Sequence, residues 1–175
     1  MRRARTTIAV TVAATALSLL GAGAASAGTG PVPAPRASAP ADTAGTEAGN
    51  PLSAAAVTAG VCSDAAQIGT TSYIYRGTET IASVKQFYSA SCDENYGYVW
   101  VWKSFLDQNL TFDLTVGVWS FDRDSLVGQR VVFDTHDQEF WGNAADTSDE
   151  CTSGEGTVTI PGDPQPYTAR SSKRC

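Results

Sequence analysis

The single histidine of this chain limits the catalytic chemistry that the sequence can support. His136 is the only candidate base for a Ser-His-Asp or Cys-His mechanism. It lies in the stretch 134–139, whose Asp134, Asp137 and Glu139 could also bind a metal ion. No G-x-S-x-G motif accompanies it. If the stretch is a turn between two strands, its carboxylates form a solvated polar loop, and we favour that interpretation.

Paired carboxylates could serve glycoside hydrolysis, which needs two of them across a sugar-binding cleft. Asp113, Asp134 and Glu139 are the candidates. On a strand, Asp113 would point away from the apolar face that Phe112 and Leu114 form. Any acidic β-protein offers such pairs, so the pattern is weakly specific.

The remaining motifs do not indicate a cofactor. Zinc is not expected, because no C-x-x-C pair is present. Asp122-x-Asp124 lacks the glycine and the terminal glutamate of a calcium loop and is typical of a β-turn. No phosphate-binding loop or dinucleotide motif occurs. We therefore predict no catalytic residues, no metal and no cofactor, and a protein that is not an enzyme.

The N-terminus has the pattern of a secretory signal peptide over residues 1–27. Three early arginines precede an apolar stretch at 8–20 that is too short to span a bilayer, and Ala25-Ser26-Ala27 is a cleavage site. The net charge is −6 and falls to −9 without those arginines. Because nucleic acid and anionic membranes need clustered Lys and Arg, we expect neither as a partner. The expected location is extracellular.

Four cysteines in an exported chain indicate two disulfides: Cys62, Cys92, Cys151 and Cys175. Three pairings are possible, and the sequence alone does not choose among them. We favour the local pairing, Cys62 with Cys92 and Cys151 with Cys175. Each bridge would then be worth roughly 3 kcal/mol in the chain-entropy description.

Composition divides the rest of the chain near residue 61. Residues 28–60 hold five of the eight prolines and no aromatic side chain, which predicts a disordered Pro/Ala-rich tail. Within it, the small apolar run 52–57 is either a plain linker or a segment that orders on a partner, and a helix over 52–59 is an alternative. The candidate partner-binding residues of this run are Leu52, Ala54, Ala56 and Val57.

Residues 61–175 contain all sixteen aromatic residues and a period-two pattern. Short strands separated by turn residues predict an all-β fold, a small antiparallel β-sandwich or barrel, and we favour the sandwich. Arg76-Gly77 is the expected two-residue hairpin turn. The expected strands are 73–75, 78–88, 96–103, 110–120, 129–134, 138–141, 157–160 and 167–171.

An aromatic stripe marks one of these strands, where Tyr96, Tyr98, Trp100 and Trp102 alternate with smaller residues. A regular strand places all four on one face. We expect that face to pack into the core, because Lys103 would leave the opposite valine face in solvent. The alternative is an exposed ladder for sugar stacking or protein contact. Under that alternative, Trp100 and Trp102 are candidate partner-binding residues, and Trp119 on another strand is a third.

The stretch from Cys62 to Trp102 carries a further pattern, Y-x-Y-x-G followed by V-K-Q-F-Y-S-x-x-C-x-x-N-Y-G-Y-V-W-V-W. It resembles small secreted β-domain proteins of Streptomyces, one group of which is the adaptor subunit of umbrella-shaped antibacterial toxin particles. The resemblance implies a secreted adaptor in interbacterial competition. Its implied partners are a large repeat-containing toxin chain and a lectin-like subunit, with residues 28–60 as the partner-binding extension. The alternatives are a carbohydrate-binding module, a secreted protease inhibitor and a small hydrolase using His136.

Overall fold

The computed structural model describes residues 43–175, so the expected signal peptide and residues 28–42 of the expected tail lie outside the described residues. No helix within 43–175 is long and apolar enough to cross a membrane. The described elements are α1 (Ala54–Ala59), β1 (Ala66–Arg76), β2 (Glu79–Ser89), β3 (Glu94–Val101), α2 (Lys103–Leu106), β4 (Phe112–Ser120), β5 (Ser125–Thr135), β6 (Glu139–Trp141), β7 (Thr152–Thr159) and β8 (Tyr167–Arg170).

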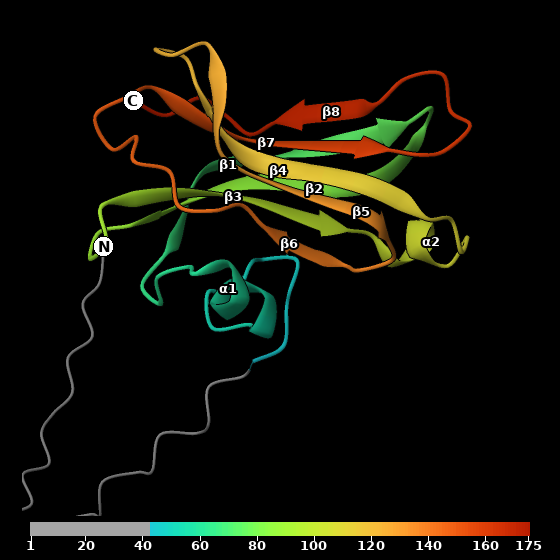
Figure 1. Ribbon diagram of the computed structural model, residues 1–175, viewed down its shortest axis with the longest axis horizontal. Helices are drawn as coiled ribbons and strands as arrows, with labels where there is room; N and C mark the ends of the chain where they lie inside the picture. The colour runs from blue at the N-terminus through green and yellow to red at the C-terminus, as the bar shows by residue number, and fades with distance from the viewer. Residues whose placement is uncertain (1–42) are drawn as a thin grey trace, which may run out of the picture. The chain divides into compact units, whose positions relative to one another are not determined.

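Eight strands form two antiparallel sheets that pack face to face (Figure 1). The first sheet has the strand order β1-β2-β3-β6, and the second has the order β5-β4-β7-β8. The all-β, antiparallel, sandwich-like prediction is therefore confirmed. The first hairpin turn is shifted by one residue, because Arg76 pairs with Glu79 and leaves Gly77-Thr78 as the turn. Gly77 takes the left-handed conformation (φ 61°) that such a turn favours.

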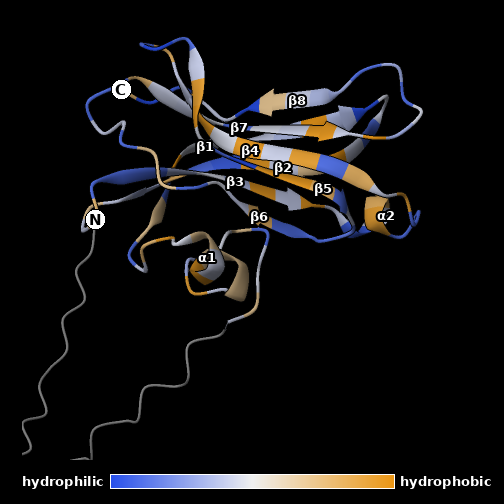
Figure 2. Cartoon of the chain, in the orientation of Figure 1, coloured by the Kyte–Doolittle hydropathy of each residue, from blue (hydrophilic) through white to orange (hydrophobic). Residues whose placement is uncertain are grey.

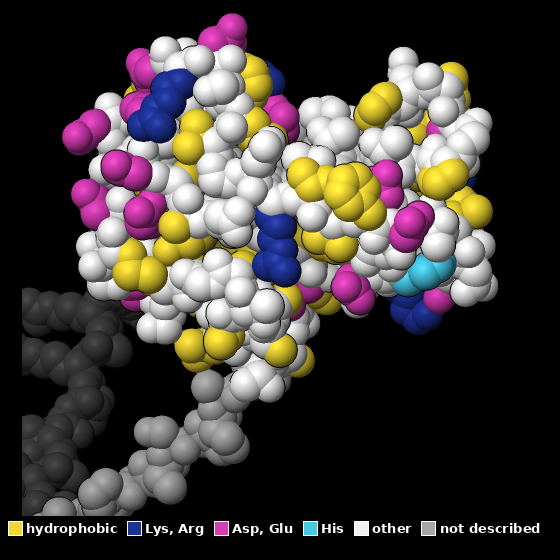
Figure 3. All heavy atoms as spheres, in the orientation of Figure 1, with side chains coloured by type: hydrophobic (Ala, Val, Ile, Leu, Met, Phe, Trp, Pro, Cys, Tyr) yellow, Lys and Arg dark blue, Asp and Glu magenta, His cyan; other side chains and the backbone are white. Residues whose placement is uncertain are grey.

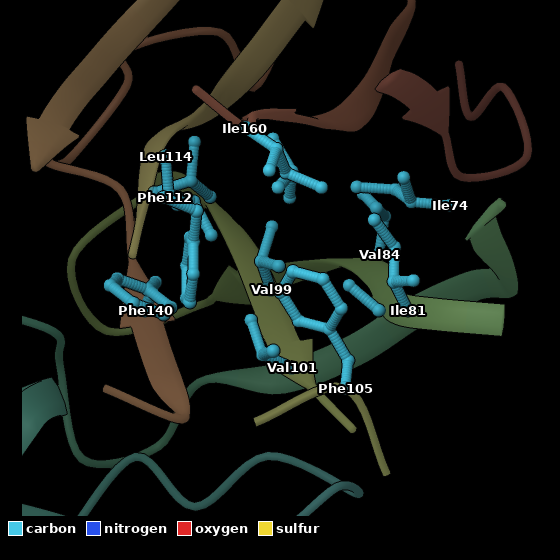
Figure 4. Close-up of a cluster of buried hydrophobic side chains, with 13 residues drawn as sticks. Ile74, Ile81, Val84, Val99, Val101, Phe105, Phe112, Leu114, Phe140 and Ile160 are labelled. Atoms are coloured by element: carbon cyan, nitrogen blue, oxygen red, sulfur yellow. The ribbon is translucent and has the colours of Figure 1, made fainter. Parts of the chain in front are cut away.

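The core between the sheets is formed by aliphatic and phenylalanine side chains from both layers (Figures 2 and 4). Strand β3 contributes Val99 and Val101, which are 0% and 1% exposed. The expectation that the aromatic face of this strand fills the sandwich core is therefore wrong. Its valine face does so, together with Ile74, Ile81, Ala82, Val84, Phe105, Phe112, Leu114, Val116, Phe140, Val158 and Ile160.

The aromatic face of β3 is nevertheless not an exposed ladder. Tyr96 and Tyr98 are 1% and 0% exposed, because residues 43–61 fold across the outer surface of the first sheet. We call residues 43–61 the strap. A second apolar cluster forms beneath it, in which Ala56 and Val61 pack with Phe87, Tyr96, Tyr98 and Trp141. The chain thus adds a third layer to the two sheets (Figure 1).

The strap overlaps the expected disordered tail, and this part of the expectation is corrected. Its helix α1 begins after Ser53, whose hydroxyl accepts a hydrogen bond from the amide of Ala56 at 3.1 Å. It ends at Gly60, which adopts the left-handed conformation of a C-cap. Low aromatic content predicts disorder because such a segment cannot form its own core. Here the aromatic surface comes from β2, β3 and β6 instead.

Two disulfides connect the expected cysteine pairs, Cys62 with Cys92 and Cys151 with Cys175. Disulfides of this kind fit an oxidising, extracellular type of environment. The first bridge ties the residue that follows the strap to the turn between β2 and β3. It therefore holds one end of the strap in place over the sheet.

Candidate protein-binding groove beside β6

The strap is fixed to the sheet by an ion pair whose lysine is buried and whose carboxylate is partly exposed. The Lys85 ammonium, on a side chain 3% exposed, lies 2.6 Å from the Glu47 carboxylate and also donates to the Glu47 carbonyl. Ser83 donates a second hydrogen bond to the same carboxylate at 3.0 Å. A buried lysine needs such partners, because an unpaired charge in an apolar environment is strongly destabilising. Glu47 therefore determines where the strap crosses β2.

Aromatic packing holds the middle of the strap. The Tyr98 and Trp141 rings have centroids 4.5 Å apart, and the Phe87 and Trp141 rings 4.7 Å apart. The Tyr98 hydroxyl donates to the carbonyl of Thr46. Burial, followed by the nearby carboxylates, raises the pKa of this phenol well above its ordinary value. The phenol therefore stays protonated and can donate this bond throughout the physiological range.

Two adjoining hollows of about 310 Å³ and 410 Å³ lie beside β6 and α1. They share four residues, Ala54, Ala55, Asp137 and Glu139, and we call the combined depression the β6 groove. The first hollow is also lined by Arg130 and Val132 of β5, and the second by Trp100 and Gln138. In Figure 3 basic and hydrophobic surface lie next to each other above the helix. The α1 wall is low because it is formed by the small side chains of Ala54, Ala55 and Thr58.

The backbone of β6 has one edge turned away from its sheet. Val101 donates its amide hydrogen to Gln138 at 2.8 Å, and Gly142 donates to Gly97 at 2.9 Å. In an antiparallel ladder, hydrogen-bonded residue pairs alternate with pairs that are not hydrogen-bonded. Because Val101–Gln138 and Gly97–Gly142 are bonded, Val99 and Phe140 between them form a hydrogen-bonded pair as well. The N–H and C=O groups of the alternate residues, Glu139 and Trp141, must then point away from β3. Both residues line the groove, and no strand within 43–175 pairs with that edge of β6, but Trp141 is buried, so the edge is covered at that residue.

The groove carries charges of both signs. The Glu139 carboxylate accepts hydrogen bonds from Ser53 at 2.8 Å and from the Trp141 indole at 2.9 Å. Asp137 is exposed, and within residues 43–175 neither it nor Arg130 takes part in an ion pair. Two carboxylates and one guanidinium are thus available to a ligand that carries both basic and acidic groups.

Part of the predicted partner-binding set lies at this groove. Ala54 and Trp100, far apart in the sequence, line the same hollow. Leu52 and Val57 are on the strap and are 38% and 65% exposed. Ala56, in contrast, is fully buried on the side of α1 that faces the sheet, where it packs the helix against the aromatic cluster.

The other two predicted tryptophans are elsewhere. Trp102 follows the last residue of β3 and precedes helix α2, and it does not belong to the apolar cluster beneath the strap. Trp119 is on the outer face of β4, with the guanidinium of Arg170 3.6 Å from its ring centroid. This cation–π contact occupies the ring face that a sugar would stack on.

The candidate catalytic residues do not converge on one site. His136 is exposed in the turn between β5 and β6. The Asp113 carboxylate accepts the amide hydrogen of Asp134 at 2.9 Å and so supports the backbone near the end of β5. Asp122 accepts from the Cys151 amide at 2.7 Å, as a turn residue would. Within residues 43–175 no group of three or more metal-ligating side chains is found.

Sequence reasoning missed the importance of Lys85, Glu47 and the free edge of β6. A lysine inside an otherwise apolar strand signals a buried charge, but nothing local in the sequence identifies Glu47 as its partner. The free edge depends on sheet order, which is a property of the whole fold.

Comparison with family models, curated proteins and solved structures finds no match to this chain. Its function must therefore be argued from the groove itself.

Proposed function

We propose that this protein is a secreted, non-catalytic adaptor that joins other secreted proteins, and that the β6 groove is its principal contact. The observation that carries the proposal is the groove, a pair of adjoining hollows bordered by Ala54 and Ala55 of α1 and by the carboxylates of Asp137 and Glu139. A surface hollow with apolar walls and a few charged side chains suits contact with another protein. The two disulfides suit a domain that keeps its shape outside the cell.

The partners proposed are a large repeat-containing toxin chain and a lectin-like subunit, as in an antibacterial toxin particle. The acidic character of the chain supports a basic contact surface on at least one of them, because complementary charge speeds and orients association. No described observation favours the carbohydrate-binding or inhibitor alternatives. Tyr96 and Tyr98 of the aromatic stripe are covered by the strap, and the guanidinium of Arg170 lies over the Trp119 ring.

The test is affinity capture by the tagged mature protein from the producer's culture supernatant, with mass spectrometry of what is recovered. Ala54→Arg fills the groove, whereas Val57→Arg places the same side chain on an exposed position of the same helix outside it. We expect stoichiometric recovery of other secreted proteins with the unmodified protein and with Val57→Arg, and loss of recovery with Ala54→Arg. Recovery of the protein alone would overturn the adaptor function. Undiminished recovery with Ala54→Arg would overturn the groove as the contact.

A further inference from the structure

We propose that two copies of this chain associate through the edge of strand β5, which pair antiparallel about a two-fold axis at Val132. The inference goes beyond the adaptor function and does not depend on it, because it concerns contact between identical chains. It is supported by free main-chain groups on this edge, by exposed apolar side chains along it, and by a charge pattern that complements itself.

The hydrogen-bond phase of the second sheet leaves part of β5 unpaired. Phe121 donates its amide hydrogen to Cys151 at 2.9 Å, in continuation of the register between β4 and β7. Because alternate residues of a strand direct their main-chain groups to opposite sides, the odd-numbered residues of β4 bond to β7 and the even-numbered ones to β5. Leu114 is even-numbered and lies opposite Val132. The two neighbours of Val132 must therefore direct their N–H and C=O groups away from β4.

Those neighbours, Val131 and Phe133, are accessible. Their side chains are 42% and 69% exposed, and no strand within 43–175 pairs with this side of β5, which lies at the edge of the second sheet (Figure 1). Earlier in the strand the edge is occupied, because Asn143 donates to the carbonyls of Gly128 and Gln129 at 2.8 Å and 2.7 Å. An unpaired edge with exposed apolar side chains is a template for another strand.

The sequence of this free edge complements itself. In an antiparallel pair centred on Val132, Arg130 of each copy lies opposite Asp134 of the other, and Val131 lies opposite Phe133. A two-fold axis makes each of these contacts twice. Within residues 43–175 neither Arg130 nor Asp134 takes part in an ion pair, so both charges are available to a second copy.

The phase of the free groups limits the register. Val131 and Phe133 must face residues whose main-chain groups also point outward, which allows a two-fold axis at either of them or at Val132. An axis at Val131 would place Arg130 opposite Val132, and an axis at Phe133 would place Asp134 opposite Val132. The axis at Val132 is the one that sets opposite charges against each other.

The test is the mass of the full mature protein in solution, measured by sedimentation over a concentration series that reaches about 1 mM. Salt at about 0.15 M shortens the Debye length to about 8 Å and so limits repulsion between the two acidic chains. We expect a reversible dimer. Arg130→Asp and Asp134→Arg should each weaken it about tenfold or more, because each substitution acts at both ends of the contact. Monomer at every concentration, or a dimer indifferent to both variants, would overturn the proposal.

An equimolar mixture of these two variants supplies a readout that a general surface effect would not move. One variant carries acidic groups at both positions and the other carries basic groups at both, so a mixed dimer regains two opposite-charge pairs. We expect the mixture to associate while each variant alone stays monomeric. A mixture that is no more associated than its components would refute the register.

The matched control is Asp124→Arg. Asp124 is exposed in the turn before β5 and has a φ of 46°, close to the 47° of Asp134, so the backbone strain of an arginine is the same at both positions. This variant should leave the dimer unchanged. Equal weakening by Asp124→Arg and Asp134→Arg would show that the charge at 134 is not part of a specific contact.

Amide exchange locates the contact on β5. As the concentration rises, the Val131 and Phe133 amides should slow by about tenfold or more, because new hydrogen bonds form there. The Val132 amide, already bonded to β4, should not change. A dimer that leaves the Val131 and Phe133 amides unprotected would overturn strand pairing.

Self-association and the adaptor function fail separately. Two joined copies would present two β6 grooves to a partner with repeated sites, which raises avidity. A monomer that still captures secreted proteins overturns this inference alone. A dimer that captures none overturns the function alone.

Discussion

Removing the carboxylate of Glu47 should destabilise the strap through the lysine it leaves behind. In Glu47→Gln the Lys85 ammonium stays on a side chain 3% exposed, with a neutral amide in place of its counter-charge. Removing one partner of a fully buried pair is destabilising by roughly 3–5 kcal/mol. Because the Glu47 side chain is 37% exposed, solvent screens part of this interaction, and we expect about 2 kcal/mol.

A double-mutant cycle separates the ion pair from other effects of the two substitutions. Lys85→Met removes the charge and keeps an apolar stem under the strap, so Glu47→Gln should be far less destabilising in that background. The expected coupling free energy is on the order of 1–2 kcal/mol. The assay is denaturant unfolding with both disulfides intact, together with amide exchange over residues 43–61 to detect local opening of the strap.

The control for this cycle is the exposed pair between Lys103 and Asp107, whose side chains are 78% and 60% exposed. Asp107→Asn should change the unfolding free energy by less than about 0.5 kcal/mol. If Glu47→Gln is no more destabilising than this control, or if the two substitutions at 47 and 85 are additive, the buried pair does not anchor the strap.

Three further substitutions probe other parts of the fold. Gly49→Ala would place a Cβ 2.2 Å from the Phe87 ring at a φ of +87°, so it should lower the unfolding free energy by more than about 1 kcal/mol. The control is Gly60→Ala, whose Cβ meets no atom within 4 Å and which should be less destabilising. Hydrogen bonds from two serines lower the pKa of Asp64 to about 2. Because that value is below the unfolded one of about 4, the stabilising effect of Asp64 is complete above pH about 4 and is lost as the pH falls towards 2. Asp64→Asn should therefore flatten the thermal stability profile in that window, and an unchanged slope would contradict this assignment. Cys175→Ser opens a disulfide with a sequence separation of 24 and should lower the unfolding free energy by roughly 2–4 kcal/mol, with wild-type stability as the contrary result.

The strands and disulfides were predictable because their signals are local. Period-two alternation and turn residues indicate where strands begin and end, and the eight expected strands overlap β1 to β8. The orientation of β3 was not predictable from the same pattern. Both of its faces are apolar because both are covered in the fold. Without a polar, solvent-exposed face, the alternation of residues does not show which face packs between the sheets. The argument from Lys103 failed because that residue begins α2 and is not in the strand.

A helix over 52–59 was an alternative that α1 confirms, but the packing of the strap on the sheet was not predicted, because its stability is entirely tertiary. A six-residue helix of small residues is too short to be stable alone. It forms here on a surface of Phe87, Tyr98 and Trp141 that comes from three other strands. Composition indicates how much apolar surface a segment can bury by itself. It does not indicate whether another part of the fold has an apolar face on which the segment can pack. The position of the β6 groove depends on this placement and could not be predicted from the sequence.

Strap and groove are coupled through Glu139, and the coupling constrains how variants should be interpreted. Ser53, which caps α1, donates to the carboxylate that borders the groove, so movement of the strap alters both the α1 wall and the charge beside β6. Glu47→Gln should therefore weaken partner capture as well as stability, although Glu47 does not line the groove. Ala54→Arg should weaken binding while leaving the unfolding free energy nearly unchanged, because Ala54 is exposed and lies at the start of the helix. If Glu47→Gln opens the strap by amide exchange and partner capture is unaffected, α1 is not a wall of the binding site.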